Sequence, residues 1–283
     1  MKRHNKKNNK SRVYLKVILA VLLVLLGITF YNEQESRNLN NKSDATSTAN
    51  IEESYIESNK EDSNNESKNS NINKKSSDFD LDSIEEYSGN PSISVNGNIP
   101  FFSQEDIVTK EFEKYSKLDS LGRCGVAFAN ISKSTLPTED RGEIGAIKPS
   151  GWTYKSKSNN NKYPDLINGN YVYNRCHLIA YCLAGENANE LNLITGTRYL
   201  NVEGMLPLEE KVADYMKDNP SNHVLYRVTP CFKDDNLIAS GVLIEAYSVE
   251  DKGKGICFCK YCYNVQPGIK INYKNGLNSR DNS

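Results

Sequence analysis

The stretch YVYNRCHL, residues 171–178, is predicted to form a short strand that carries His177 at its end. A second short strand is predicted at residues 191–195, LNLIT, and the glycine-flanked residues 196–204 are expected to turn the chain. This part of the chain therefore consists of two short strands in close succession, with a histidine at the end of the first.

A helix is predicted to follow the second strand. Pro207 fits its first turn, where the missing N–H of proline costs nothing, and Asn219 with the proline after it ends the helix. Glu209 lies near the positive end of the helix. The apolar stripe of this helix consists of Met205, Leu208, Val212 and Tyr215.

Strands are also expected on either side of this strand, strand, helix unit. Residues 223–232, 237–248 and 255–265 are separated by short turns, and this spacing predicts an antiparallel meander. Residues 123–131 are predicted to form a buried strand, and residues 137–161 a long polar loop. The fold class is therefore α+β: a central antiparallel β-sheet with the unit inserted before its last strands.

The N-terminal third of the chain has a different composition. Residues 1–12 are basic, and residues 13–31 are mostly apolar, which predicts a membrane segment with the basic tail in the cytoplasm. No convincing small-x-small cleavage site follows, which favours an uncleaved anchor over a signal peptide. Residues 32–87 are rich in Asn, Ser, Glu and Lys and are expected to be a disordered linker. Residues 88–283 are then the folded domain, on the extracytoplasmic side of the membrane.

This predicted domain holds as many basic as acidic residues and has no net charge. A nucleic-acid partner would therefore have to meet a local basic patch rather than a domain of high positive charge.

All seven cysteines lie in the predicted domain, and their odd number leaves at least one of them without a partner in the chain. Cys257, Cys259 and Cys262 invite a zinc-binding interpretation. They lack a matching second C-x-x-C pair, and their alternation with apolar residues fits a strand. A zinc-stabilised binding module remains an alternative.

The chain has three histidines, and histidine is the side chain best suited to accept a proton near neutral pH. His4 lies in the basic tail. His223 stands at the head of a predicted strand, where a structural histidine is expected. His177 is therefore the candidate general base.

Two sequence motifs resemble one family. NRCH at residues 174–177, followed by NLITGTRYLN at residues 192–201, resembles the DNA/RNA non-specific endonucleases, and the likeness runs from about residue 118 to residue 269. Within that family the chain looks closest to secreted or membrane-anchored DNases of Gram-positive bacteria. The resemblance implies that the strand, strand, helix unit is the family's ββα-metal finger.

The resemblance also implies roles for individual residues. His177 becomes the general base that takes a proton from water, and Asn201 the protein ligand of one Mg²⁺, for which Mn²⁺ can substitute. Arg175 and Arg198 are candidates to hold the phosphate through their forked donors. Glu209 matches the family's acidic residue, which orients water on the metal. Such an arrangement meets the two needs of phosphodiester hydrolysis, a nucleophile made in place and charge neutralisation.

The family's first motif is typically Asp-Arg-Gly-His, and this chain departs from it. Asn174 stands where the acid is expected, so an amide has to take over any part of that acid in orienting the finger. Residues 140–143, DRGE, copy three letters of the motif without its histidine, and a glutamate could replace the imidazole only with a large rise in its pKa. Arg141 and Lys148, with Lys155 and Lys157 in the loop that follows, are instead candidates for the basic patch that contacts nucleic acid.

Simpler interpretations stand beside these roles. Asn201 could cap a helix, and Glu209 could be a first-turn acid that interacts with the helix dipole. Arg175 and Arg198 could form surface salt bridges. Cys176 beside His177 suggests a Cys–His peptidase, although adjacent strand residues face opposite sides.

The sequence as a whole predicts an extracytoplasmic, membrane-tethered, Mg²⁺-dependent endonuclease that hydrolyses DNA, and RNA as well, with little sequence preference. The competing prediction is a catalytically silent surface protein of the same fold that binds nucleic acid or a partner, which loss of His177 or Asn201 would favour. An inhibitor protein is left open as a further partner, as is the oligomeric state.

Overall fold

The computed structural model describes residues 79–152 and 161–282. The predicted basic tail (1–12), the predicted membrane segment (13–31) and the predicted linker up to residue 78 lie outside the described residues. Lys155 and Lys157 of the predicted basic patch lie outside them as well. Within the described ranges, no helix is long and apolar enough to cross a membrane.

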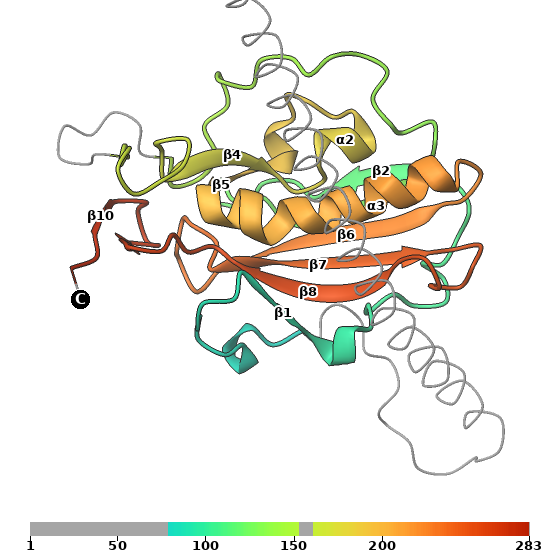
Figure 1. Cartoon of the computed structure of the whole chain (residues 1–283), viewed down its shortest axis with the longest axis horizontal. Coiled ribbons are helices and arrows are strands. Elements are labelled where there is room, and N and C mark those ends of the chain that lie inside the picture. The colour runs from blue at the N-terminus through green and yellow to red at the C-terminus, as the bar shows by residue number, and fades with distance from the viewer. Residues whose placement is uncertain (1–78, 153–160, 283) are drawn as a thin grey trace, which may run out of the picture. The chain divides into compact units, whose positions relative to one another are not determined.

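An antiparallel sheet forms the centre of the fold (Figure 1). The three strands predicted as a meander are consecutive neighbours in it, each paired antiparallel with the next, so that prediction is confirmed. In spatial order the strands are β1 (Ser92–Ser94), β8 (Cys257–Tyr263), β7 (Gly241–Ser248), β6 (Val224–Cys231), β3 (Ala127–Ile131) and β2 (Phe112–Tyr115).

β3 begins later than the strand predicted from residue 123, because Arg123 belongs to a turn. The backbone N–H of Arg123 donates to Oδ1 of Asp119 at 2.9 Å, and its Nε donates to Oδ2 of the same carboxylate at 2.7 Å. The carbonyl of Arg123 accepts from the N–H of Asp119 at 3.0 Å. With these backbone groups used in the turn, the strand ladder starts at Ala127, which pairs with Val228 and Tyr115.

The predicted strand, strand, helix unit is present between β3 and β6. β4 (Tyr173–His177) pairs antiparallel with β5 (Leu193–Thr197), and His177 lies opposite Leu193. The short helix α2 (Tyr181–Ala184) and the turn η5 (Glu190–Asn192) connect the two strands. Helix α3 (Leu206–Asp218) follows with Pro207 in its first turn, as predicted.

The segment between β5 and α3 differs from the prediction. Residues 196–204 were expected to turn, whereas β5 continues to Thr197 and the chain then enters the π-helical segment η6 (Leu200–Met205), which runs directly into α3. Oγ1 of Thr197 accepts from the N–H of Leu200 at 2.9 Å and so starts the helical segment. Gly196 looked like a turn residue, but it lies within β5, where a glycine is needed because a side chain would collide with Sγ of Cys176.

The sheet is buried on both faces. Its inner face packs against Met205 at the end of η6 and against Val212 and Met216 of α3. The predicted stripe faces this core, with Leu208 and Tyr215 only partly buried, and Met216 was not part of the prediction. A buried ion pair lies between the central strands, where Nε of Arg227 is 2.7 Å from Oε2 of Glu245.

The outer face is covered by residues that precede β2. The linker was predicted to extend to Tyr87, but apolar side chains between residues 79 and 95 pack against Leu243, Cys259 and Tyr261 of the sheet. Isolated apolar residues in a polar stretch show no helical or strand periodicity in the sequence. Only their packing on the sheet shows that they belong to the core. The covering residues are Phe79, Leu81, Ile84, Tyr87, Ile93 and Val95.

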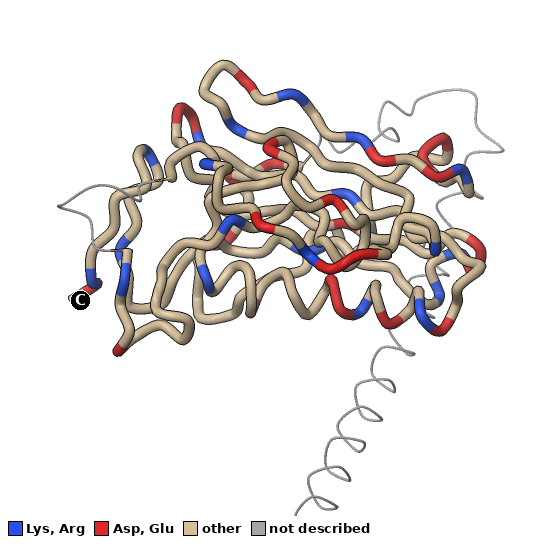
Figure 2. Tube along the Cα trace, turned by 90° about the horizontal axis from the view of Figure 1, so that it is seen from above, with Lys and Arg blue, Asp and Glu red and all other residues tan. Residues whose placement is uncertain are grey.

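Three smaller elements complete the described fold. The turns η3 (Leu81–Ser83) and η4 (Asn96–Asn98) flank β1, and the hairpin of β9 (Ile269–Ile271) and β10 (Asn278–Arg280) follows β8. Basic and acidic residues are interspersed along the trace (Figure 2), which agrees with a domain of no net charge.

Candidate active site

Most of the predicted site residues meet in a pocket of about 550 Å³. Its walls come from the loop at residues 141–152, from β4 and the residues up to 182, and from the segment 198–209. Lys148 does not line it. The other predicted site residues all do: Arg141, Arg175, His177, Arg198, Asn201 and Glu209.

His177 is buried at the end of β4, with 7% of its surface exposed. Its Nε2 lies 2.8 Å from the carbonyl oxygen of Asn187. A carbonyl oxygen only accepts hydrogen bonds, so Nε2 of the neutral ring carries the proton and Nδ1 keeps its lone pair. Nδ1 lies 3.4 Å from Nη2 of Arg141. The atom of His177 that can accept a proton is therefore the one beside Arg141, another residue that lines the pocket.

The surroundings of His177 favour its neutral form. Burial lowers the pKa of the imidazole below its ordinary value, the hydrogen bond to Asn187 raises it by less, and the positive charge of Arg141, the smallest effect, lowers it. The ring is therefore uncharged at pH 7, as a general base has to be.

Asn201 lies inside a helical segment rather than at a cap. Tyr199 is the N-cap residue of η6 and Met205 that of α3, so the helix-cap interpretation of Asn201 is wrong. Its side chain lines the pocket, and its amide makes no hydrogen bond to any other residue that the structure describes. An amide oxygen without a partner in a polar pocket suits a hard cation such as Mg²⁺, which takes oxygen ligands and keeps several waters.

Glu209 occupies the first turn of α3, yet only 9% of its surface is exposed. Burial raises the pKa of its carboxyl to about 8, the neighbouring Glu210 raises it as well, and Arg141 lowers it. The position fits the first-turn interpretation, but the carboxyl lines the pocket instead of lying on the helix surface. Buried carboxyls with a shifted pKa in a pocket are typical of functional sites, and a cation beside this one would favour its charged form.

Arg175 fixes the loop that forms one wall of the pocket. Its Nε donates to the carbonyl oxygen of Ile147 at 2.5 Å, and its Nη2 donates to that of Gly145 at 2.8 Å. The guanidinium also lies over the ring of Trp152, 4.1 Å from its centroid. Two of its five N–H donors thus hold the loop, in contrast to the salt-bridge interpretation.

Arg198 and Arg141 present guanidinium groups to the pocket. The side chain of Arg198 passes over Gly169, where a β-carbon would lie 3.3 Å from Nε of the arginine. No carboxylate of the described residues pairs with Arg198, so a surface salt bridge is not found. Arg141 is exposed, and its charge reaches both His177 and Glu209. These two guanidinium groups are placed to receive an anion.

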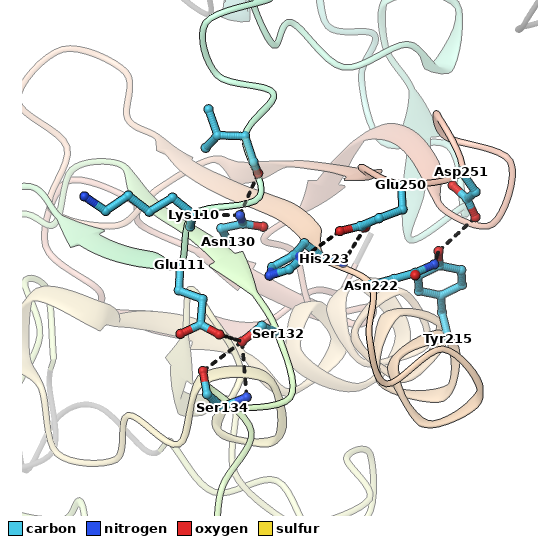
Figure 3. Close-up of polar contacts among 11 residues, drawn as sticks. Lys110, Glu111, Asn130, Ser132, Ser134, Tyr215, Asn222, His223, Glu250 and Asp251 are labelled. Atoms are coloured by element: carbon cyan, nitrogen blue, oxygen red, sulfur yellow. Dashed lines mark hydrogen bonds and ion pairs between the residues drawn. The ribbon is translucent and has the colours of Figure 1, made fainter.

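The other histidine and the neighbouring cysteine are structural. His223 is directed at Glu250, with its Nδ1 2.6 Å from Oε1 of the carboxylate (Figure 3). His223 does not line the pocket. This confirms the structural interpretation of His223. Cys176 is fully buried in the core, and burial raises the pKa of its thiol far above the ordinary value. The peptidase interpretation is therefore wrong, because this thiol is protonated and faces away from His177.

The cysteines of β8 do not form a common site. Cys259 packs on the outer face of the sheet, whereas Cys262 packs on the inner face with the residues of α3. In residues 79–152 and 161–282, no group of three or more His, Cys, Asp or Glu side chains is arranged to hold a metal ion. The described residues thus contain no ligand cluster that would support the alternative of a zinc-stabilised module.

Asn187, Trp152 and Tyr181 are among the residues of the site that the sequence did not reveal. Asn187 contributes its backbone carbonyl, which leaves no mark in the side-chain pattern. Trp152 and Tyr181 line the pocket, and the hydroxyl of Tyr181 donates to the carbonyl of Glu139 at 2.6 Å. Only Trp152 carried a usable signal, since it is the one tryptophan of the chain and stands in the polar loop.

The comparisons with known proteins agree on one family. The family model described as "DNA/RNA non-specific endonuclease" matches residues 103–250. A curated deoxyribonuclease of Streptococcus dysgalactiae subsp. equisimilis is 32% identical over 110 residues, which are 38% of this chain and 32% of the relative. The alignment thus spans about a third of that relative's length.

Solved structures show the same fold. Sda1 nuclease, determined with bound zinc ion, has a TM-score of 0.52 and 29% identity over 60% of this chain and 82% of its own. NucA from Streptococcus agalactiae, determined with magnesium ion bound, has a TM-score of 0.55 and 23% identity over 66% of this chain and 86% of its own. The family match covers half of the chain, and both motifs of the pocket fall inside it. The chain belongs to the DNA/RNA non-specific endonuclease family.

Proposed function

We propose that the protein is a divalent-metal-dependent endonuclease that hydrolyses the phosphodiester bonds of DNA, and of RNA as well, without sequence preference. The observation that carries this proposal is the state of His177. Its Nε2 is fixed on the carbonyl of Asn187, its Nδ1 keeps a lone pair beside Arg141, and burial lowers the pKa of the ring, which favours its neutral form. Membership of the family adds the substrate class.

In the proposed reaction, His177 removes the proton from an attacking water molecule. The bond from Nε2 to Asn187 fixes the tautomer, so that Nδ1 is the atom that accepts the proton. Arg141 lies beside Nδ1 in the structure, and its guanidinium has to turn toward the phosphate for water to take that position. The exposure of Arg141 leaves room for this movement.

The pocket fits a hard divalent cation. Asn201 would hold the ion through its amide oxygen, and Glu209 would orient a water molecule near it through its carboxyl group. When bound, the cation supplies positive charge that neutralises the phosphate and the charge developing on the leaving 3′ oxygen. We assign Mg²⁺ as the physiological ion, with Mn²⁺ as a substitute, because oxygen donors favour these ions over zinc.

The three arginines of the pocket have two different proposed roles. Arg198 and Arg141 would hold its oxygens by paired N–H donors, while Arg175 keeps the loop wall in place through Ile147 and Gly145. Lys148, which is exposed and does not line the pocket, would contact the nucleic acid away from the cleaved bond. The products would carry 5′ phosphates.

The proposed location is outside the cytoplasm, at the cell membrane. The support for this location is the basic and apolar N-terminal sequence, residues 1–31, which favours an anchor over a cleaved signal peptide. Cleavage would then take place close to the cell surface.

Digestion of supercoiled plasmid tests the function. The wild-type chain is expected to nick and linearise plasmid with Mg²⁺ or Mn²⁺ and to leave it intact with EDTA. His177→Ala is expected to lose cleavage, whereas His223→Ala, which changes a histidine outside the pocket, keeps it. A wild-type chain that shifts DNA on a gel without cleaving it would overturn the proposal in favour of a silent binding protein.

A further inference from the structure

The segment that precedes the family match contacts the helical segment that carries Asn201. Residues 79–95, here called the N-terminal strap, lie before residue 103, where the match to the family begins. The strap crosses the outer face of the sheet and adds β1 to its edge, with Ser92 paired to Cys262 of β8 (Figure 1). It is therefore part of the folded unit that the family match leaves out.

The strap is tied to the start of η6 by two hydroxyl groups. The hydroxyl of Tyr87 donates to the hydroxyl of Tyr199 at 3.1 Å, and that of Tyr199 donates to the carbonyl of Gly89 at 3.2 Å. The two rings meet edge to face, with centroids 5.9 Å apart. Tyr199 is the N-cap residue of η6, two residues before Asn201 and next to Arg198.

A second contact lies farther along η6. A β-carbon at Gly204 would lie 3.7 Å from the carbonyl oxygen of Pro91 and 3.3 Å from Cβ of Cys262. That carbonyl of Pro91 also accepts from the N–H of Tyr263 at 3.0 Å. The helical segment that carries Asn201 thus lies against both the strap and β8.

The strap is fastened to the sheet independently of η6. The hydroxyl of Tyr263 donates to the carbonyl of Glu85 at 2.9 Å, and the ring of Tyr263 packs edge to face on Tyr87. The hydroxyl of Tyr263 therefore binds the strap and not η6. The strap has one anchor on the sheet and another on η6.

We propose that the strap is a positioning element of the active site, in which Tyr87 and Tyr199 set the placement of Asn201 toward the divalent cation. This inference rests on the proposed function, since it takes Asn201 as the metal ligand. Loss of a group that orients a metal ligand without itself binding the metal commonly weakens metal affinity by about 10-fold or more. Tyr87 and Tyr199 act through Asn201 and do not touch substrate.

The test compares Tyr87→Phe, Tyr199→Phe and the matched control Tyr263→Phe in the full chain. Each variant keeps its ring and loses one hydroxyl. Mg²⁺ binding is measured by calorimetry, melting temperature by circular dichroism, and plasmid cleavage as a function of Mg²⁺ concentration. Tyr87→Phe and Tyr199→Phe are expected to bind Mg²⁺ about 10-fold more weakly while keeping the cleavage rate at saturating Mg²⁺. Tyr263→Phe is expected to bind Mg²⁺ as the wild type does.

Two results would overturn the inference: wild-type Mg²⁺ affinity in both Tyr87→Phe and Tyr199→Phe, or equal loss of affinity and melting temperature in all three variants. A wild-type chain that binds no Mg²⁺ would overturn it too. Failure of the proposed function looks different, because the wild type would then bind Mg²⁺ with the strap dependence described and still leave plasmid intact.

Discussion

Replacing Arg141 by glutamine is expected to raise the pKa of His177. The guanidinium of Arg141 lies 3.4 Å from Nδ1 and opposes the positive charge that protonation would place on the ring. Removing this charge stabilises the protonated imidazole, so the pKa of His177 moves up toward its ordinary value. Glutamine keeps a donor of similar shape, which limits the change to the charge.

The size of the effect follows from the distance and the exposure. Two unit charges about 4 Å apart interact by about 1 kcal/mol in water and by about 4 kcal/mol near a protein surface. Arg141 is exposed, which places its effect at the lower end, at about 1 kcal/mol. Since the protonated ring gains about this much free energy when the charge of Arg141 is removed, we expect the pKa of His177 to rise in Arg141→Gln.

The assay is a pH titration of the His177 ring signal by NMR in the metal-free full chain, assigned with His177→Ala. Lys148→Gln serves as the control, because it removes the same charge from the same loop outside the pocket and should leave the pKa of His177 unchanged. In parallel, the acid limb of kcat/KM should move to higher pH in Arg141→Gln. An unchanged or lower pKa of His177 in this variant would refute the electrostatic reasoning.

Three further substitutions test other parts of the structure. Asn201→Ala is expected to abolish Mg²⁺ binding in calorimetry and Mg²⁺-dependent cleavage, and retention of both would remove Asn201 as the ligand. Arg227→Met leaves Glu245 buried without its partner and should cost about 3–5 kcal/mol in urea unfolding, a loss that an unchanged midpoint would contradict. Gly196→Ala forces a β-carbon against Sγ of Cys176 and should destabilise the protein by about 1–3 kcal/mol by the same measurement, whereas wild-type stability would show that β4 and β5 adjust freely.

The central part of the sheet was predictable because its signal is local. The strands β6, β7 and β8 are long, rich in β-branched and aromatic residues and separated by short turns, so each stood out in the sequence. The short edge strands β1 and β2 gave no such signal, since they exist through pairing with β8 and β3. The same reason explains the misplaced end of the linker at Tyr87, whose ring packs against Tyr199 and Tyr263.

The site was predictable where family motifs mark it. His177 and Asn201 stand in those motifs, and both line the pocket. The partners that fix them were not predictable, because Asn187 acts through its backbone carbonyl and Tyr87 acts from a distant segment. Arg175 shows the opposite case, since it lines the pocket as predicted, but its Nε and Nη2 donate to the loop rather than remaining free for a phosphate.

The central claim is that His177 takes the proton from the attacking water. Its most direct test is kcat/KM of His177→Ala on an end-labelled DNA duplex at saturating Mg²⁺, with Mg²⁺ affinity measured on the same protein. We expect kcat/KM to fall by about 10²- to 10⁴-fold, the usual contribution of general base catalysis, while Mg²⁺ affinity stays at the wild-type value. A variant that cleaves within a few-fold of the wild type would contradict the claim.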